Sequence, residues 1–317
     1  MKALRVGIVG MGHLGNYHLQ KYLKMPDVKV VGVSDLIREK AQRGADVCNG
    51  KACLDYGDLI GQVDAASITV PTQAHYQTAK AFLAEGKDVL LEKPIAADCE
   101  EADELIALAE SKNLILQIGF VERFNPAIIA LGDVLHNPLF IEIHRLHPFF
   151  ERGTDVDVIL DLMVHDLDIL LHFVASPIRS LEAVGASVLS DKPDIANARL
   201  TFASGCVANI TASRITTKTL QKIRFFCSDG YHAVDYAQRE LLSLKSYKGE
   251  DGKSQIIENK IDIRQQDPLE EEIRSFVHAV RTRSKPVVSG REGRDVLELA
   301  MRISKEISRH RPSIAGG

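Results

Sequence analysis

The feature that most constrains the fold of this chain is a short apolar segment that runs directly into a glycine-rich turn. Residues 4–9 read LRVGIV, and residues 10–15, GMGHLG, match the pattern G-x-G-x-x-G and open a helical stretch. Gly10 permits a tight turn, Gly12 lets a phosphate approach the backbone, and Gly15 allows the helix to pack closely. Because the N-terminus of such a helix offers free N–H groups and a positive dipole end, the motif predicts a dinucleotide-binding site. The residues predicted to contact the cofactor here are Gly10, Gly12, His13, Leu14 and Gly15.

An acidic residue at the end of the second predicted strand indicates which dinucleotide binds. Asp35 lies 20 residues past Gly15, where an acid accepts hydrogen bonds from the 2′- and 3′-hydroxyls of the ribose. A carboxylate at this place would repel a 2′-phosphate. Arg38 could accommodate such a phosphate, although an exposed helix residue is the plainer interpretation. The sequence therefore predicts NAD as the cofactor, with NADP as the less favoured alternative.

Apolar runs and amphipathic stretches alternate through the first 120 residues, which is typical of a doubly wound α/β domain. The apolar runs suit strands that are buried on both faces of a parallel sheet. These runs are Leu4–Val9, Val28–Val33, Ala65–Val70, Val89–Leu91 and Leu114–Ile118. Between them lie helical patterns such as Asp98–Ser111, where Asp98 and Glu101 have the spacing of a capping box. We predict a Rossmann domain over residues 1–120.

The pattern changes after Phe120, and we predict a second domain over residues 121–317. Helical patterns occur at Pro126–Leu135, Val158–Val174, Pro268–Arg281 and Arg294–Arg309, and an alternating strand pattern occurs at Phe140–Leu146. From residue 178 to 263 the chain has successive strand patterns separated by turn residues, which predicts a mostly antiparallel sheet. The predicted fold class is therefore α/β, with a parallel sheet followed by a mostly antiparallel one.

Composition and charge narrow the class of protein further. The formal net charge is -4, tryptophan is absent and aromatic residues make up 6% of the chain, which argues against nucleic-acid binding. Five cysteines, odd in number and without C-x-x-C spacing, argue against a disulfide framework and against a zinc site. The first residues pass directly into a strand, and no apolar run reaches the roughly 18 residues of a membrane span. We expect a cytoplasmic protein without a signal peptide, a membrane segment or a metal ion.

A lysine at the carboxyl end of a predicted strand is the first candidate for chemistry. Glu92-Lys93-Pro94 follows the run Val89–Leu91, and ligands of doubly wound sheets bind outside this end of the strands. A lysine there can hydrogen-bond a developing alkoxide and stabilise its charge. Pro94 is compatible with a cis peptide bond. The run Ala65–Val70 ends at the same edge of the sheet, and Pro71 and His75 follow it. Further cofactor contacts are therefore predicted for Thr69, Pro71, His75, Glu92 and Lys93.

Polar residues on the predicted helix Val158–Val174 are the second candidate. They fall at i, i+4, i+7 and i+11 and so form one stripe on an otherwise apolar helix. The stripe comprises Asp161, His165, Asp168 and His172, and Asp166 lies outside it. Asp161 can fix the orientation of the His165 imidazole, which suits a general base that takes a hydroxyl proton during hydride transfer. A solvated helix face and half of a metal site are the alternatives.

Taken together, GMGHLG at residues 10–15, Glu92-Lys93-Pro94 and Asp161-x-x-x-His165 resemble the Gfo/Idh/MocA family of dehydrogenases. The resemblance covers essentially the whole chain, including PLEEEI at residues 268–273. It implies a Rossmann domain followed by an α/β domain with an open, mostly antiparallel sheet that often mediates dimer or tetramer formation. It also implies that Lys93, Asp161 and His165 act on a sugar or cyclitol hydroxyl. Met163 is a departure, because many members have glycine there, so no substrate is transferred from the better-known members.

Three basic residues indicate which kind of substrate could bind. Arg145 and His147 share one face of the predicted strand, and Arg123 lies at the predicted domain junction. They could contact an anionic group, or they could be surface and sheet-stabilising cations. The stretch Arg145–Asp168 is similar to family members that oxidise UDP-N-acetylglucosamine at its 3-hydroxyl, which implies a nucleotide sugar. A free sugar or inositol substrate is an alternative, and a non-catalytic NAD-binding sensor is an alternative from another class.

Overall fold

The computed structural model describes residues 2–149, 156–249 and 254–309. Two compact units make up the chain: Met1–Phe124 with Asp267–Leu297, and Asn125–Gln266 with Glu298–Gly317. The first segment of the first unit ends at Phe124, close to the predicted boundary at residue 120. The first unit also contains Asp267–Leu297, which the sequence pattern assigns to the second domain. Within the described ranges, no helix combines the length and the apolar character needed to cross a membrane.

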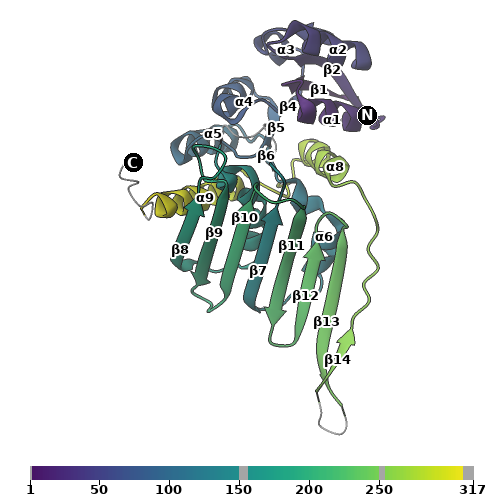
Figure 1. Cartoon of the computed structure of the whole chain (residues 1–317). Helices are drawn as coiled ribbons and strands as arrows, with labels where there is room; N and C mark the ends of the chain where they lie inside the picture. The colour runs from purple at the N-terminus through teal and green to yellow at the C-terminus, as the bar shows by residue number, and fades with distance from the viewer. Residues whose placement is uncertain (1, 150–155, 250–253, 310–317) are drawn as a thin grey trace, which may run out of the picture. The chain divides into compact units, whose positions relative to one another are not determined.

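The first unit is built on a six-stranded parallel sheet with the strand order β3-β2-β1-β4-β5-β6 (Figure 1). This is the strand order of dinucleotide-binding Rossmann folds, so the predicted fold of the N-terminal part is confirmed. The strands are β1 (Leu4–Val9), β2 (Val28–Ser34), β3 (Lys51–Cys53), β4 (Ala65–Ile68), β5 (Asp88–Glu92) and β6 (Leu116–Gly119). The helices are α1 (His13–Tyr22), α2 (Arg38–Cys48), α3 (Gly57–Ile60), η1 (Thr72–Ala74), α4 (His75–Ala84), α5 (Cys99–Ser111), η2 (Val121–Phe124) and α8 (Pro268–Thr282).

All five apolar runs that the sequence predicts as strands of this unit are strands. β1 has the predicted bounds, and Asp98 caps α5 by accepting a hydrogen bond from the Glu101 N–H at 2.9 Å, as the capping-box spacing predicts. β3 was not predicted, because its three residues include a lysine and give no apolar run. The strand pattern is readable here because both faces of the sheet are covered.

Helix α8 completes the core of the first unit from a distant part of the sequence. Ile273 and Phe276 are fully buried in one apolar cluster with Val6 and Ile8 of β1 and with Leu19 of α1. The apolar residues of α8 recur at helical spacing, so one face of the helix is buried. Glu272 is buried with this face, whereas Arg274 is exposed. The sheet strands and α8 therefore form one hydrophobic core.

The second unit is built on an eight-stranded sheet with the order β14-β13-β12-β11-β7-β10-β9-β8. Neighbouring strands are antiparallel except β7 and β10, which are parallel, so the predicted mostly antiparallel sheet is confirmed. The strands are β7 (Pro138–Leu146), β8 (Ile178–Ala186), β9 (Ile195–Phe202), β10 (Val207–Ser213), β11 (Leu220–Cys227), β12 (Gly230–Asp235), β13 (Glu240–Lys248) and β14 (Ser254–Glu258). The helices are α6 (Pro126–Gly132), η3 (Ile159–Met163), α7 (Val164–Phe173) and the second part of α9 (Gly290–Arg309).

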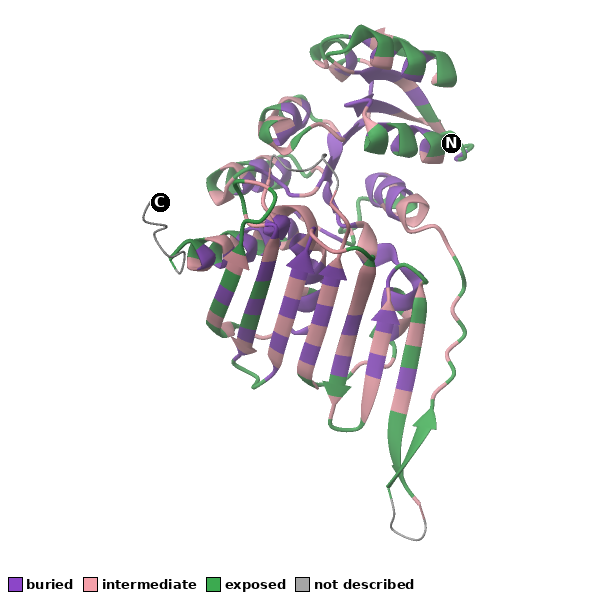
Figure 2. Cartoon of the chain, in the orientation of Figure 1, coloured by how far each residue is buried: buried purple, intermediate pink, exposed green. Residues whose placement is uncertain are grey.

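One face of this sheet is buried and the other is open. Ile141 and Ile143 of β7 are fully buried, whereas Phe140, Glu142 and His144 between them are only partly buried. The same alternation runs through the central strands and appears as stripes in Figure 2. Helix α6 packs on β12 and β13, and η3 packs on β10. A sheet with one covered face has the alternation of apolar and polar residues that the sequence shows at β7.

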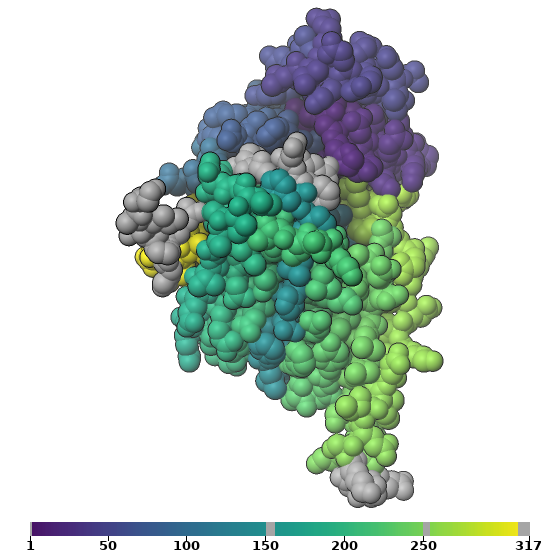
Figure 3. All heavy atoms as spheres, in the orientation of Figure 1, coloured from purple at the N-terminus to yellow at the C-terminus, as the bar shows by residue number. Residues whose placement is uncertain are grey.

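The β13–β14 hairpin stands out from the rest of the second unit in the space-filling view (Figure 3). All five residues of β14 are exposed. Ile256 and Ile257 are therefore apolar side chains on the surface of this hairpin.

Candidate cofactor site and active-site residues

The glycine-rich turn has the geometry that its sequence predicts. Gly10 has a φ of +93°, in the left-handed region that favours glycine, and a Cβ on it would lie 2.8 Å from the Thr69 backbone. A Cβ on Gly15 would lie 1.9 Å from the carbonyl oxygen of Gly10. A Cβ on Gly12, by contrast, would meet no protein atom within 4 Å. The first and third glycines are therefore required by packing, while the second leaves open space at the N-terminus of α1 for a phosphate.

Asp35 follows β2 and is oriented by the same turn. Its Oδ2 accepts a hydrogen bond from the Met11 N–H at 2.8 Å, and its Oδ1 accepts one from the Ile37 N–H at 2.8 Å. A carboxylate has about four acceptor positions, so two backbone bonds leave capacity for ribose hydroxyls. Arg38 is exposed at the first position of α2. The open space over Gly12 and the oriented carboxylate fit an NAD molecule.

Thr69 and His75 hold the turns around this site together. The Thr69 hydroxyl donates to the carbonyl oxygen of Gly10 at 2.6 Å. His75 is buried, with Nδ1 lying 2.7 Å from the carbonyl oxygen of Pro94 and Nε2 lying 2.9 Å from that of Val70. Burial lowers the pKa of His75, while its contacts with the two backbone carbonyl oxygens oppose this shift. His75 thus ties the end of β4 to the turn after β5, and its predicted contact with the cofactor, like that of Pro71, stays a prediction.

Lys93 lies directly after β5, on a turn that is held by contacts between buried residues. The Lys93–Pro94 peptide bond is cis, and Lys93 is half-buried. Oε1 of Glu92 lies 3.0 Å from Nε2 of His18 on α1, and Nδ1 of that ring lies 2.7 Å from the hydroxyl of Ser67 on β4. The side chain of Glu92 therefore enters the interior of the first unit. His18 is not predictable from the sequence, since a single histidine on a helix has no pattern of its own.

His18, Glu92 and Glu272 are metal-ligating residue types that lie close together. Their ligand atoms all lie within 4.8 Å of one another, and all three residues are buried. Both ring nitrogens of His18 are already engaged, one with Ser67 and the other with Glu92. We describe these three residues as a buried polar cluster of the first unit and assign no metal ion to it.

Asp161 and His165 lie on a helix that begins with a wider turn than the sequence pattern assumes. Residues Ile159–Met163 form a π-helix, η3, which continues as α7. Both side chains are half-buried. The predicted polar stripe does not have uniform surroundings, because Asp168 is 1% exposed whereas His172 lies on the surface. The predicted pairing of Asp161 with His165 stays a prediction.

Asp166, which the sequence places outside the stripe, holds Arg145. The guanidinium of Arg145 donates from Nε to Oδ2 of Asp166 at 2.8 Å and from Nη2 to Oδ1 at 3.0 Å. Arg145 is 3% exposed, and its guanidinium lies 4.8 Å from the ring centre of Tyr236. A buried bidentate pair of this kind favours the sheet-stabilising alternative for Arg145 over a contact with the substrate.

The other two basic residues differ from each other in their surroundings. Arg123, on η2, is 7% exposed, and its Nη2 lies 3.5 Å from Oε1 of Glu292 within the first unit. His147 follows β7, is half-buried and is hydrogen-bonded to Gln221. Burial and the charge of Arg145 lower the pKa of His147, against the opposing effect of the Asp161 carboxylate. The Asp161 carboxylate therefore lies close enough to His147 to affect its pKa.

Comparison with known proteins agrees with this architecture over both units. Residues 4–120 match the model of the oxidoreductase family with an NAD-binding Rossmann fold, Gfo/Idh/MocA, and residues 130–232 match a C-terminal domain of the same family. UDP-N-acetylglucosamine 3-dehydrogenase from Acidithiobacillus ferrooxidans is 36% identical over 305 residues, covering 95% of this chain and 96% of that protein. A solved structure of the enzyme of that name from the same organism has a TM-score of 0.90 and covers 98% of this chain and 99% of its own.

More distant relatives act on cyclitols. Myo-inositol 2-dehydrogenase from Thermotoga maritima is 26% identical over 329 residues, covering 97% of each chain. A structure of scyllo-inositol dehydrogenase from Lactobacillus casei with bound NAD(H) and scyllo-inositol has the same fold, with a TM-score of 0.81 at 20% identity and coverage of 97% and 98%. This chain belongs to the Gfo/Idh/MocA family of NAD-binding oxidoreductases.

Proposed function

We propose that this protein is an NAD-dependent dehydrogenase that oxidises a secondary hydroxyl of a nucleotide sugar, with UDP-N-acetylglucosamine oxidised at C3. The observation that carries the proposal is the similarity, over 95% of the chain, to a relative with that activity. The oriented Asp35 carboxylate and the open space over Gly12 support NAD as the cofactor. The first unit then binds the cofactor and the second unit the substrate.

Lys93, His165 and Asp161 carry the chemistry in this proposal. Bound NAD supplies the hydride acceptor. His165 takes the hydroxyl proton as a general base, a role worth about 10²- to 10⁴-fold in rate, and Asp161 orients its imidazole. The Lys93 ammonium donates a hydrogen bond to the substrate oxygen as that oxygen gains alkoxide character. The position of Lys93 directly after β5, on a turn held by His75, supports this role.

The substrate proposal predicts turnover that is confined to nucleotide sugars. Purified protein is incubated with UDP-N-acetylglucosamine, UDP-N-acetylgalactosamine, N-acetylglucosamine or myo-inositol, with NAD or NADP, and reduced cofactor is followed by absorbance. A ketone trap is included, because an unfavourable equilibrium would hide the reaction. We expect kcat/KM for UDP-N-acetylglucosamine with NAD to exceed kcat/KM for N-acetylglucosamine and for myo-inositol by at least about 100-fold, which corresponds to a few hydrogen bonds to the nucleotide.

Each other outcome of this assay has a defined meaning. Preference for myo-inositol would replace the substrate and keep the mechanism, a result that the similarity to inositol dehydrogenases makes the second candidate. NAD binding without turnover of any of these compounds would contradict the proposed substrates and favour the non-catalytic sensor.

We also propose that two copies of the chain associate through the open face of the second unit's sheet. Phe140, Phe226 and Tyr231 form an aromatic row across β7, β11 and β12, with ring centres 5.5 Å and 5.1 Å apart. Charged residues beside the row are paired within the face, as Arg224 is with Glu142 at 2.9 Å. A neutral apolar row of this kind is self-complementary, as a two-fold symmetric contact requires.

This surface makes a prediction about oligomeric state. Phe226→Asp is expected to weaken self-association by at least about 30-fold, because aromatic residues at the centre of an interface contribute about 2 kcal/mol or more. Sedimentation velocity across a concentration series measures the change. Ile129→Asp, which places the same charge on an exposed position of α6, is the control and is expected to leave association unchanged. A monomeric wild-type protein would contradict the proposal.

Finally, we propose a cytoplasmic location for the enzyme. All five cysteines are free thiols in this structure. Free thiols suit a reducing compartment.

A further inference from the structure

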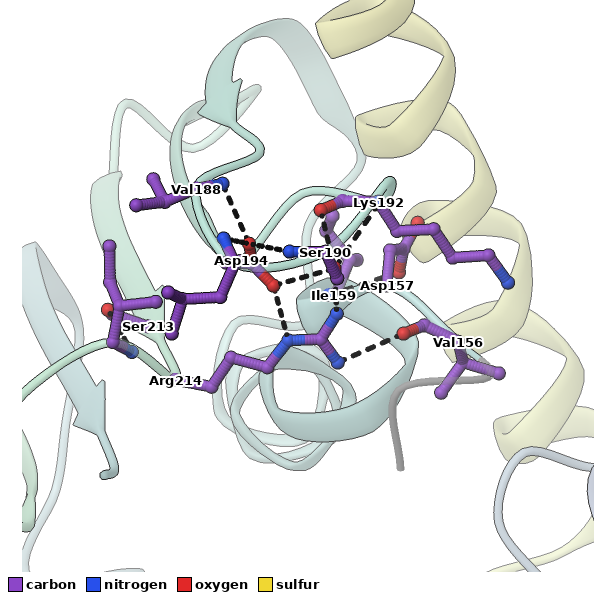
Figure 4. A network of polar contacts seen from close by, with 11 residues as sticks. Val156, Asp157, Ile159, Val188, Ser190, Lys192, Asp194, Ser213 and Arg214 are labelled. Atoms are coloured by element: carbon purple, nitrogen blue, oxygen red, sulfur yellow. Dashed lines mark hydrogen bonds and ion pairs between the residues drawn. The ribbon is translucent and has the colours of Figure 1, made fainter. Parts of the chain in front are cut away.

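The start of the segment that carries Asp161 and His165 is held by a network of polar contacts within the second unit (Figure 4). The segment begins as the π-helix η3, a rare turn that occurs frequently at functional sites. The first N–H groups of any helix have no acceptor inside the helix, so residues outside it must supply one. In this chain, several separate parts of the sequence contribute to the network around this helix start.

Asp157 accepts hydrogen bonds from the helix start. Its Oδ1 accepts from the N–H of Ile159 at 3.1 Å and from the N–H of Leu160 at 2.9 Å. Its carbonyl oxygen accepts from the N–H of Asp161 at 3.0 Å. Its Oδ2 accepts from the hydroxyl of Ser304 on α9 at 3.0 Å. One side chain therefore joins the first turn of η3 to the second part of α9.

Arg214, just after β10, holds the backbone that precedes Asp157. Its Nη1 donates to the carbonyl oxygen of Val156 at 3.1 Å. Its Nε donates to Oδ1 of Asp194 at 2.9 Å, and its Nη2 donates to the hydroxyl of Ser190 at 3.1 Å. Because a guanidinium is planar and its donors have fixed directions, these contacts fix three backbone regions relative to one another.

Asp194 is the buried carboxylate partner of this arginine. It is fully buried, and its Oδ2 accepts from the N–H groups of residues 188–190 at 2.7, 2.6 and 3.0 Å. Burial raises the pKa of Asp194, but the backbone hydrogen bonds, the Ser190 hydroxyl and Arg214 together hold it well below its usual range. The loop that Asp194 closes also touches the helix start, where the carbonyl oxygen of Pro193 accepts from the Val158 N–H at 3.1 Å.

We infer that Asp157, Ser190, Asp194 and Arg214 are positioning residues for the reaction. They fix the first turn of the segment and thereby set the direction in which Asp161 and His165 face the substrate hydroxyl. The inference rests on the proposed function, in which none of the four touches the reacting atoms. A general base displaced by about 1 Å loses up to about 100-fold in rate, so anchors of this kind control kcat.

Two conservative substitutions test this role. Arg214→Lys keeps the charge but cannot make the forked contacts, and we expect kcat to fall about 10- to 100-fold. Ser304→Ala removes the hydroxyl that donates to Oδ2 of Asp157, and we expect kcat to fall about fivefold. The dissociation constant of NAD is expected to change less than about twofold in both, because the residues that fit the cofactor lie in the first unit.

The ring signals of His165 provide a readout that does not depend on turnover. In protein labelled with ¹⁵N-histidine, and with His165→Asn to assign the signals, both substitutions are expected to shift the His165 resonances. The matched controls are Ser308→Ala, one turn further along α9, and exposed Arg179→Lys on β8, and both are expected to leave kcat and the spectrum unchanged.

The outcomes separate this inference from the proposed function. Folded variants with wild-type kcat, or a loss of kcat without any shift of the His165 resonances, would overturn the positioning role. If Arg214→Lys does not fold, Ser304→Ala decides by the same two measurements. If the wild-type protein turns over no sugar at all, the proposed function fails, and the resonances of His165 alone still decide whether the network positions it.

Discussion

Lys93→Met is expected to lower kcat by about 10²- to 10³-fold while NAD still binds, because the ammonium is proposed to stabilise the alkoxide that forms in the reaction. Methionine keeps the length and the apolar stem of lysine. The contacts that hold the turn, Glu92 to His18 and His75 to Pro94, do not involve the Lys93 side chain. Fold and cofactor affinity should therefore survive, and steady-state rates together with a fluorescence titration of NADH measure the two effects separately.

Lys87→Met is the matched control for this experiment. Lys87 immediately precedes the amino end of β5, whereas Lys93 follows its carboxyl end, where ligands of a parallel sheet bind. The control is expected to keep kcat within about twofold of wild type, as surface substitutions usually do. Retention of most of the activity in Lys93→Met would remove this lysine from the mechanism. A rise in the dissociation constant of NAD as large as the loss of kcat would make Lys93 a cofactor-binding residue instead.

The parts of the fold that the sequence predicts are those encoded by local patterns. The strands of a covered parallel sheet are apolar runs, so the runs around Val6 and Leu90 are recognisable without knowledge of their neighbours. The glycine-rich turn is predictable for the same reason, since the space required by Gly10 and Gly15 is set by the turn and its first neighbours. The return of α8 to the first unit is a long-range contact of an amphipathic helix, and nothing in its own pattern names its partner.

The partners of charged residues are the part of the candidate site that the sequence could not supply. Alternation along β7 correctly places Arg145 on the same face as Ile141 and Ile143, but that face is the buried one. A buried arginine needs a carboxylate, and Asp166 supplies it from α7, 21 residues further along the chain. The π-helix at the start of the same segment breaks the regular 100° rotation that the predicted stripe assumes. Spacing alone therefore identified the polar residues of this helix but not their separate surroundings.

Two substitutions in the glycine-rich turn are expected to separate its effect on stability from its effect on cofactor binding. Gly15→Ala places a methyl group where the carbonyl oxygen of Gly10 lies, and it is expected to lower the free energy of unfolding by about 1–3 kcal/mol and to weaken NAD binding by at least about 30-fold. Gly12→Ala meets no protein atom, so its unfolding free energy is expected to stay within about 0.5 kcal/mol of wild type. Thermal unfolding without cofactor and calorimetric titration with NAD measure the two quantities.

The expected result for Gly12→Ala is a normal fold with at least about tenfold weaker NAD binding, because the added methyl group occupies the space through which a phosphate approaches the backbone. Gly61→Ala, at the end of α3, is the control, since its Cβ also meets no atom within 4 Å and it lies outside the turn. If Gly12→Ala binds NAD as the control does, the phosphate does not approach over Gly12. The open space above this residue would then have no role in cofactor binding, although Gly10 and Gly15 would still be required by the packing of the turn.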